Sequence, residues 1–376
     1  MTPAIQDRSG VADAGRVVVK IGSSSLTTTG GRLDVDRIHR LVEVLAARRT
    51  AGQEVVLVSS GAIAAGITPL GLPVRPQDLA TAQAAASVGQ GLLVARYTAA
   101  FREHGRLVGQ VLLTAEDLIR RQHYRNAQRS LGRLLTLGVV PVVNENDAVA
   151  TDEIRFGDND RLAALVAHLV RADALVLLTD VDGLYDGPPS RPGAARISEV
   201  RGPEDLEGIE VTGRGTAIGT GGMVTKLEAA SIATNAGVPV VLTSADHVAE
   251  ALAGEPVGTW FAATGNRKST RRLWLAHSAR TQGRLVLDDG AMHAITHGKR
   301  SLLAAGILRV EGDFEPGDAV ELARTDGVVV ARGLVSYSAG EVAEIRGLTT
   351  GQLQEQGIAH PRAVVHRDDL VIVRRY

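Results

Sequence analysis

Two polar clusters flank one segment of the chain. Residues 139–143, Val-Val-Pro-Val-Val, form the kind of apolar run that makes a buried parallel strand, and Asn-Glu-Asn-Asp follows at 144–147. Gly-Asp-Asn-Asp at 157–160 then precedes an apolar periodicity typical of a helix. Open α/β sheets bind ligands where such strands end, so these carboxylates and amides predict a site for a polar ligand. The alternative is that Asp158 and Asn159 only cap the helix within a solvated loop.

Lys20 is the second candidate for chemistry. It lies near the end of a β-branched run at 16–21, and a Gly-Ser-Ser-Ser turn follows. A lysine in that position can reach a phosphate group as a point charge, although a lysine on an edge strand would read the same way. The next predicted strand, 54–58, ends in Ser-Ser-Gly at 59–61. Its hydroxyls can bind carboxylate or phosphate oxygens, but the tripeptide alone is an ordinary turn.

A glycine-rich stretch at 213–226 precedes a predicted helix at 227–236 and ends in Lys226. Free backbone N–H groups at a helix start favour a phosphate ligand. The stretch is neither a Walker A loop nor a dinucleotide fingerprint, because its glycine and Ser/Thr spacing differs from both. A mobile glycine linker is the alternative interpretation.

Together these residues point to phosphoryl transfer, which needs cations on the transferring group and an acceptor held in place. Asp160, Asp180 and Asp182 could help to neutralise or orient charge through Mg²⁺. The chain has no cysteine, and its histidines form no cluster, so no dedicated transition-metal site is predicted. The residues alone therefore predict a nucleotide-dependent phosphotransferase with an unspecified acceptor.

The predicted elements that position these residues alternate between strand and helix from residue 17 to about 261, including an alanine-rich helix at about 77–104. That alternation predicts a three-layer α/β/α sandwich around a mainly parallel sheet. After residue 264 the strands become short and are separated by turns such as Asp289-Gly290, which predicts a small β-barrel-like domain. The expected boundaries are a catalytic domain at 1–265, a linker at 266–283, the β-rich domain at 284–362 and a tail at 363–376.

Composition restricts the remaining classes. Among the 376 residues, the formal net charge of −1 argues against a broad nucleic-acid footprint. The first fifteen residues lack an apolar signal region, and no run has the length of a membrane span. A cytoplasmic protein without membrane contact is expected.

Five motifs follow one another along the chain: Val-Val-Lys-Ile-Gly-Ser at 18–23, Ser-Ser-Gly-Ala-Ile-Ala-Ala-Gly at 59–66, Asn-Glu-Asn-Asp at 144–147, Phe-Gly-Asp-Asn-Asp at 156–160 and Gly-Gly-Met-Val-Thr-Lys at 221–226. In this order they resemble the motifs of the amino-acid kinase family, and within it those of the glutamate 5-kinases. The β-rich tail resembles a PUA domain. Single motifs are shared with other kinases of the family, and the ordered set is more specific. Val224, where serine is common, is a mild departure.

The resemblance implies ATP-dependent phosphorylation of the L-glutamate side-chain carboxylate to L-glutamyl 5-phosphate, the first step of proline biosynthesis, with Mg²⁺. It also implies feedback inhibition by proline and a dimer or tetramer. Carried over by position, the glutamate-binding residues are Ser60, Asp147 and Asn159. The ATP-binding residues are Lys20, Thr179, Asp180, Thr220, Gly221, Gly222, Met223, Val224, Thr225 and Lys226. Lys20 and Lys226 would stabilise the phosphoryl group in transit, and Asp160 would hold the two lysines in place; no residue is assigned as a metal ligand.

Two alternatives remain open on the sequence. One is another kinase of the same family, such as an acetylglutamate kinase. The other is an RNA-binding module, because PUA domains elsewhere bind RNA. Between residues 284 and 362 there are eight Lys/Arg and eleven Asp/Glu, and this balance opposes affinity for a phosphate backbone.

Overall fold

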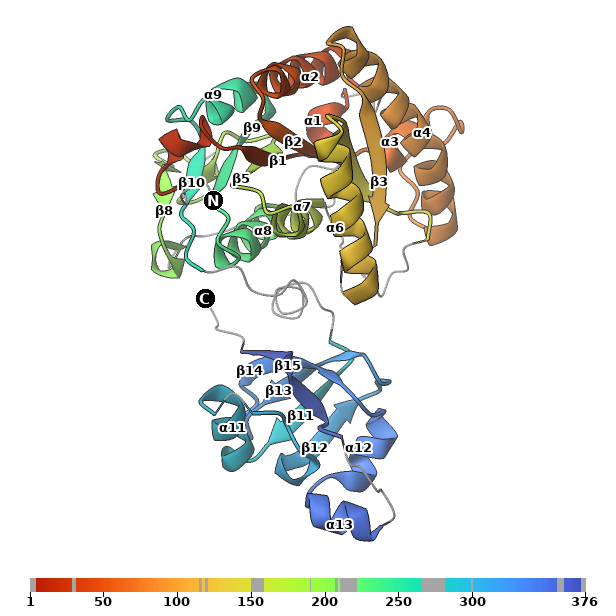
Figure 1. Cartoon of the computed structure of the whole chain (residues 1–376), viewed down its shortest axis with the longest axis vertical. Coiled ribbons are helices and arrows are strands. Elements are labelled where there is room, and N and C mark those ends of the chain that lie inside the picture. The colour runs from red at the N-terminus through yellow and green to blue at the C-terminus, as the bar shows by residue number, and fades with distance from the viewer. Residues whose placement is uncertain are drawn as a thin grey trace. The chain divides into compact units, whose positions relative to one another are not determined.

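The computed structural model describes residues 5–28, 32–114, 117–118, 121–149, 159–189, 191–206, 209, 222–265, 281–298, 300–356 and 362–372. The chain divides into two compact units, Met1–Lys268 and Ser269–Tyr376 (Figure 1).

The first unit is built on an eight-stranded sheet with the order β3-β4-β2-β1-β5-β9-β10-β8. Neighbouring strands run parallel except for β10, which is antiparallel to β9. The strands are β1 (Arg16–Ile21), β2 (Glu54–Ser59), β3 (Val108–Leu113), β4 (Val140–Glu145), β5 (Ala174–Thr179), β8 (Glu199–Val200), β9 (Val240–Ser244) and β10 (Thr259–Phe261). Because β1 pairs with both β2 and β5, the edge-strand interpretation of Lys20 is wrong.

Helices cover both faces of this sheet, as Figure 1 shows, so the three-layer α/β/α prediction is confirmed. The helices are α1 (Ser23–Leu26), α2 (Val35–Thr50), α3 (Ala62–Ile67), α4 (Leu79–Glu103), α6 (Arg121–Thr136), α7 (Asn159–Leu169), α8 (Met223–Asn235) and α9 (Val248–Leu252). A small hairpin, β6 (Leu184–Tyr185) with β7 (Arg196–Ile197), follows β5. Helix α8 starts four residues before the predicted position, which brings Lys226 into the helix.

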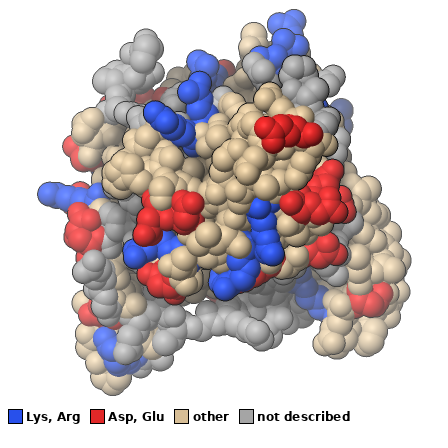
Figure 2. All heavy atoms as spheres, turned by 90° about the horizontal axis from the view of Figure 1, so that it is seen from below, with Lys and Arg blue, Asp and Glu red and all other residues tan. Residues whose placement is uncertain are grey.

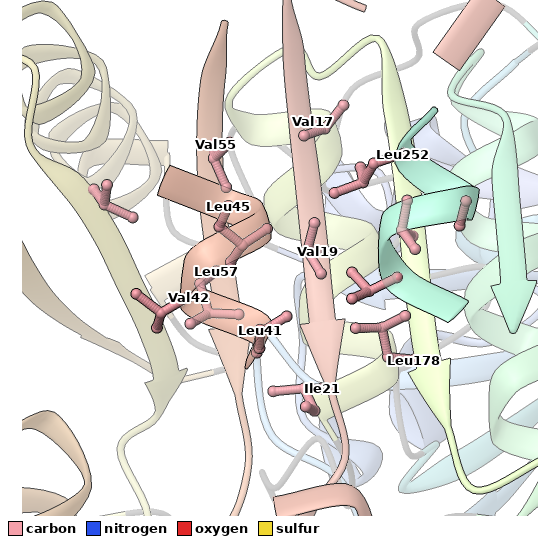
Figure 3. Close-up of a cluster of buried hydrophobic side chains, with 14 of the residues drawn as sticks. Val17, Val19, Ile21, Leu41, Val42, Leu45, Val55, Leu57, Leu178 and Leu252 are labelled. Carbon is pink, nitrogen blue, oxygen red and sulfur yellow. The ribbon is translucent and has the colours of Figure 1, made fainter. Parts of the chain in front are cut away.

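Alternate residues of the central strands face opposite layers. Val17, Val19 and Ile21 of β1 belong to the core cluster that α2, α4 and α9 cover, and Figure 3 shows these side chains in one cluster with Leu45 of α2 and Leu252 of α9. The residues between them, including Lys20, therefore face the other layer. Both faces are buried, which explains why these strands read as unbroken apolar runs.

The second unit has its own five-stranded sheet, β12-β11-β13-β14-β15, and its own core cluster. The strands are β11 (Gly283–Leu287), β12 (Ile307–Gly312), β13 (Ala319–Ala323), β14 (Val329–Val335) and β15 (Val365–Ile372), and the helices are α11 (Asp289–Thr296), α12 (Ala339–Ile345) and α13 (Thr350–Glu355). In Figure 2, acidic and basic side chains are interspersed over the face of the molecule that is drawn.

Two sequence expectations for this unit are wrong. The segment expected to be a tail supplies β15, which pairs with β14. The Asp289-Gly290 turn is the first turn of α11, because the Asp288 side chain accepts from the Ala291 N–H and caps the helix. Within the described part of the chain, no helix is both long and apolar enough to cross a bilayer.

Candidate active site

The carboxyl ends of β1, β2, β4 and β5 lie at one edge of the sheet, since these strands are parallel. Ile21 at the end of β1 pairs with Ser59 of β2 on one side and with Leu178 of β5 on the other. Chain connections run outward from β1 in both directions, so this edge contains a topological switch point, where open α/β sheets bind ligands.

Lys20, Asp160 and Lys226 meet at this edge. Lys20 points from β1 toward the layer of α7 and α8; Asp160 lies in the first turn of α7, and Lys226 in the first turn of α8. The Asp160 carboxylate forms ion pairs with both lysines, through Oδ1 to Lys20 Nζ and through Oδ2 to Lys226 Nζ at 3.2 Å. Their exposures are only 4% for Lys20, 1% for Asp160 and 8% for Lys226. Two cations and one anion leave a net positive charge, suited to an anionic group in transit.

The state of Asp160 follows from its partners. Burial raises the pKa of this carboxyl and is the largest single effect, but the Lys20 and Lys226 ammonium groups together lower it more, so the pKa lies below its ordinary value. Asp160 is therefore a carboxylate at neutral pH, with both oxygens facing lysines. It does not suit the role of a proton acceptor.

Asn159 faces the other half of the site. Its Nδ2 lies within hydrogen-bond distance of the Ser59 carbonyl at 3.0 Å, of Ser60 Oγ at 3.1 Å and of Asn144 Oδ1 at 2.6 Å. The Asn159 Oδ1 atom is buried and has no hydrogen-bond partner among the residues that the structure describes. Consecutive residues of α7 thus organise an amide and hydroxyl cluster through Asn159 and a cationic cluster through Asp160.

Helix α4 supports the amide cluster with two side chains that the sequence analysis missed. Gln90 Oε1 accepts from Asn144 Nδ2 at 2.7 Å, and the Tyr97 hydroxyl lies 2.9 Å from Ser59 Oγ. Burial raises the pKa of the Tyr97 hydroxyl, which is therefore neutral. A polar Gln90 on the otherwise apolar buried face of α4 was the available signal.

The residues expected to bind nucleotide lie on the β5 side of Lys20. Thr179 ends β5 and donates through Oγ1 to Asp180 Oδ1 at 2.9 Å. Gly222 is the extended N-cap residue of α8, and it makes no side-chain capping bond to the first-turn amides of that helix. Thr225 Oγ1 donates to the Gly222 carbonyl, while Met223 and the exposed Val224 complete that turn. Residues 213–221 of the glycine-rich stretch, which include Thr220 and Gly221, lie outside the described residues, as does Asp158.

Asp147 is half-buried in the turn that follows β4. The Asp182 carboxylate, in contrast, binds other side chains: it accepts from the Tyr185 hydroxyl at 2.8 Å and pairs with Arg196 at 3.1 Å. These contacts connect the turn after β5 to the β6–β7 hairpin. Among the residues that the structure describes, no group of three His, Cys, Asp or Glu side chains is arranged to hold a metal ion.

Comparisons with known proteins show which family this chain resembles. The model of the amino acid kinase family matches residues 15–244, and that of the PUA domain matches residues 283–354. A glutamate 5-kinase of Streptomyces coelicolor is 64% identical over 97% of this chain and 98% of its own length. One from Thermobifida fusca is 60% identical over 98% of this chain and 96% of its own.

Among solved structures, a carbamate kinase from Giardia lamblia has the same fold, with a TM-score of 0.51 and 18% identity over 67% of this chain and all of that one. The resemblance inferred from the motifs is confirmed by these matches. The chain belongs to the amino acid kinase family and, within it, to the glutamate 5-kinases, with a PUA domain following the kinase domain.

Proposed function

We propose that this chain transfers the γ-phosphoryl group of ATP to the side-chain carboxylate of L-glutamate, giving L-glutamyl 5-phosphate, the first step of proline biosynthesis. The observation that carries the proposal is the pairing of a buried cationic cluster with an amide cluster through adjacent residues, Asp160 and Asn159. Sequence identity of 60–64% to two glutamate 5-kinases, over nearly the full length of the chain, supports glutamate as the acceptor.

The proposed reaction needs little proton transfer or covalent catalysis from the protein. A glutamate side chain has an ordinary pKa of about 4.3, so the attacking carboxylate is already ionised at neutral pH and needs no general base. What it needs is a relief of repulsion, because two anions must approach each other. Lys20 and Lys226 supply that relief at the transferring phosphoryl group, and Asp160 holds their ammonium groups beside each other.

ATP would lie on the β5 side, with its phosphates toward Lys20 and the first turn of α8, where the backbone N–H groups of a helix start and the helix dipole favour anions. Thr179, Asp180 and residues 220–226 are the proposed nucleotide-binding residues. Glutamate would lie on the β2 and β4 side, bound by Ser60, Asp147 and Asn159.

Mg²⁺ belongs to the proposal as a partner of the nucleotide. The described side chains form no carboxylate cage, since Asp160 faces lysines and Asp182 is paired with Tyr185 and Arg196. The ion would be bound through ATP phosphates and water, as is common for Mg²⁺ in kinases, and would neutralise phosphate charge there. Inhibition by proline and a homo-oligomeric state are proposed on family membership alone.

Trapping of the acyl phosphate tests the function. Purified protein with ATP, Mg²⁺, L-glutamate and hydroxylamine should form γ-glutamyl hydroxamate, and omission of ATP should abolish it. N-acetylglutamate and 4-aminobutyrate, which lack the free ammonium and the α-carboxylate respectively, serve as matched acceptors. Faster turnover of N-acetylglutamate than of glutamate would instead identify a different carboxylate kinase.

A further inference from the structure

We propose that Gln90, on α4, is a positioning residue for the acceptor half of the site, acting through Asn144 to orient the amide of Asn159. The proposal rests on the glutamate kinase function above. Gln90 itself is not assigned a contact with the substrate.

Strand geometry places Asn144 toward α4. Val140 and Val142 of β4 belong to the core cluster that includes Leu93 and Tyr97 of α4. Asn144, two residues further along the strand, has the same facing, because alternate side chains share a side. Gln90 lies on the buried face of α4, at 9% exposure, and its Oε1 meets Asn144 Nδ2 at 2.7 Å.

Two backbone groups fix which way each amide points. The Glu145 N–H can only donate, and it donates to Asn144 Oδ1 at 2.9 Å; the Ser59 carbonyl can only accept, and it accepts from Asn159 Nδ2 at 3.0 Å. The Asn144 oxygen therefore faces Asn159, and the Asn144 nitrogen faces Gln90. Gln90 must present its oxygen, as it does in the structure.

The orientation of the Asn144 amide in turn determines which way the Asn159 amide points. Its nitrogen faces Ser59, Ser60 and Asn144, and its buried Oδ1 has no hydrogen-bond partner within the described part of the chain. A buried acceptor in that state costs free energy until a donor arrives. The donor that the proposed substrate supplies is its α-ammonium group, so Gln90 prepares an acceptor for the group that distinguishes free glutamate from acylated relatives.

Removal of the Gln90 oxygen would leave Asn144 Nδ2 buried without its acceptor, and the Asn144 amide would lose one of its three restraints. Gln90→Met keeps side-chain length and removes both polar atoms. We expect it to raise the KM for glutamate by about tenfold, the scale of one unsatisfied buried group, and to change the KM for ATP by less than about twofold. Gln90→Asn, which withdraws the amide by one methylene, should give the same selective rise and serves if the methionine variant folds poorly.

Leu93→Ala is the structural control, because Leu93 is buried on the same helix and has no polar contact with the site. It should lower the melting temperature without a selective change in the glutamate KM. A double-mutant cycle with Asn144→Ala then separates positioning from direct contact. If Gln90 acts through Asn144, the double variant should have a glutamate KM within about twofold of Asn144→Ala alone.

Three results would count against the idea. An unchanged glutamate KM in a folded Gln90→Met variant would remove Gln90 from the site. Multiplicative effects in the double variant would mean that Gln90 contacts the substrate directly through its Nε2. A wild-type protein that forms no glutamyl hydroxamate would overturn the proposed function itself, whereas active wild type with an unaffected variant overturns only the role of Gln90.

Discussion

Asp160 places two ammonium groups next to each other in a buried site. Buried lysines without a partner are costly, and removal of one member of a buried ion pair leaves an uncompensated charge. The Asp160 carboxylate pairs with both Lys20 and Lys226 and therefore compensates part of their buried positive charge. The same contact keeps the two cations together where a transferring phosphoryl group would need both.

Lys226→Ala should lower kcat by roughly 10²–10³, the usual scale for one electrostatic donor in a transition state. Asp160 would keep Lys20 as a partner, so the fold should survive. Steady-state kinetics with thermal melting separates the two effects. Glu228→Gln on the same helix is the control: it breaks a partly exposed pair with Arg161 and should leave kcat unchanged. A folded Lys226→Ala enzyme with nearly normal kcat would contradict the assigned role.

The pH dependence of stability should report Asp160. Because its folded-state pKa is lowered from the ordinary value of 3.8, the carboxylate contributes stability that is fully present above about pH 4 and is lost as the pH falls toward the folded-state pKa. Urea unfolding of wild type and Asp160→Asn at pH 7, 5, 4 and 3 measures this. The stability difference should be constant from pH 7 to pH 5 and should shrink at pH 3. A difference that does not depend on pH would rule out the proposed titration.

Asp147→Asn should raise the KM for glutamate with a smaller effect on ATP, if the carboxylate pairs with the substrate ammonium. Loss of a charge-assisted contact of about 1.5–3 kcal/mol corresponds to roughly ten- to a hundredfold in kcat/KM. The alternative is that Asp147 only shapes the turn after β4. In that case the variant should lose thermal stability and affinity for both substrates together.

At the scale of elements, the close packing of α3 on α4 brings the polar residues of α4 to the sheet edge. A Cβ atom added at Gly89 would lie 1.8 Å from the Ala62 carbonyl oxygen, and one added at Gly66 would lie 2.0 Å from that of Ala85. The helices therefore meet backbone to backbone. Helix α3 begins immediately after Ser60 and Gly61, and Gln90 follows Gly89 in α4. The contact between the two helices therefore positions both Ser60 and Gln90 in the amide cluster.

Gly89→Ala should destabilise the fold by at least about 2 kcal/mol, since the clash involves backbone atoms that cannot move aside cheaply. Gly91→Ala, two residues further along the same helix, is the matched control. Apart from the helix's own backbone, no atom of the described residues lies within 4 Å of the added Cβ there, so alanine should stabilise the helix by about 0.5–1 kcal/mol. Chemical denaturation measures both, and equal effects of the two substitutions would refute the packing argument.

At the scale of the whole molecule, each unit has its own hydrophobic core. The described members of the two main clusters fall entirely on one side or the other of residue 268. Every proposed catalytic and substrate-binding residue precedes that point. The PUA domain has eight basic and eleven acidic residues between 284 and 362, a balance that does not favour a nucleic-acid backbone as its partner.

A chain of residues 1–268 should therefore fold and still phosphorylate glutamate, because its core and its site are internal to it. Circular dichroism and the hydroxamate assay, applied to this chain and to the full-length protein, test the two statements separately. A folded but inactive truncated chain would mean that the PUA domain completes the active site.

The sequence alone determined the layered architecture and the positions of most strands in the first unit. Strands buried on both faces must be apolar throughout, so β1, β2, β4 and β5 stand out as β-branched or aliphatic runs. The polar residues directly after them mark the edge of the sheet where we propose that the substrates bind. The same logic failed for the second unit. Its strand β15 contains charged residues in the stretch Val-His-Arg-Asp-Asp-Leu-Val-Ile, which does not resemble a buried strand until its partner β14 is known.

Only the tertiary structure decided which polar side chains meet. Lys20 and Asp160 are 140 positions apart in the sequence, and Asn144 and Gln90, which are in contact, are 54 positions apart. No periodicity encodes such contacts, because they depend on how closely α7 and α4 approach the sheet and on the facing of each strand residue. The sequence identified Lys20 as a cation near a turn. Packing alone determines that Lys20 is buried, that it shares the Asp160 carboxylate with Lys226, and that Gln90 binds Asn144.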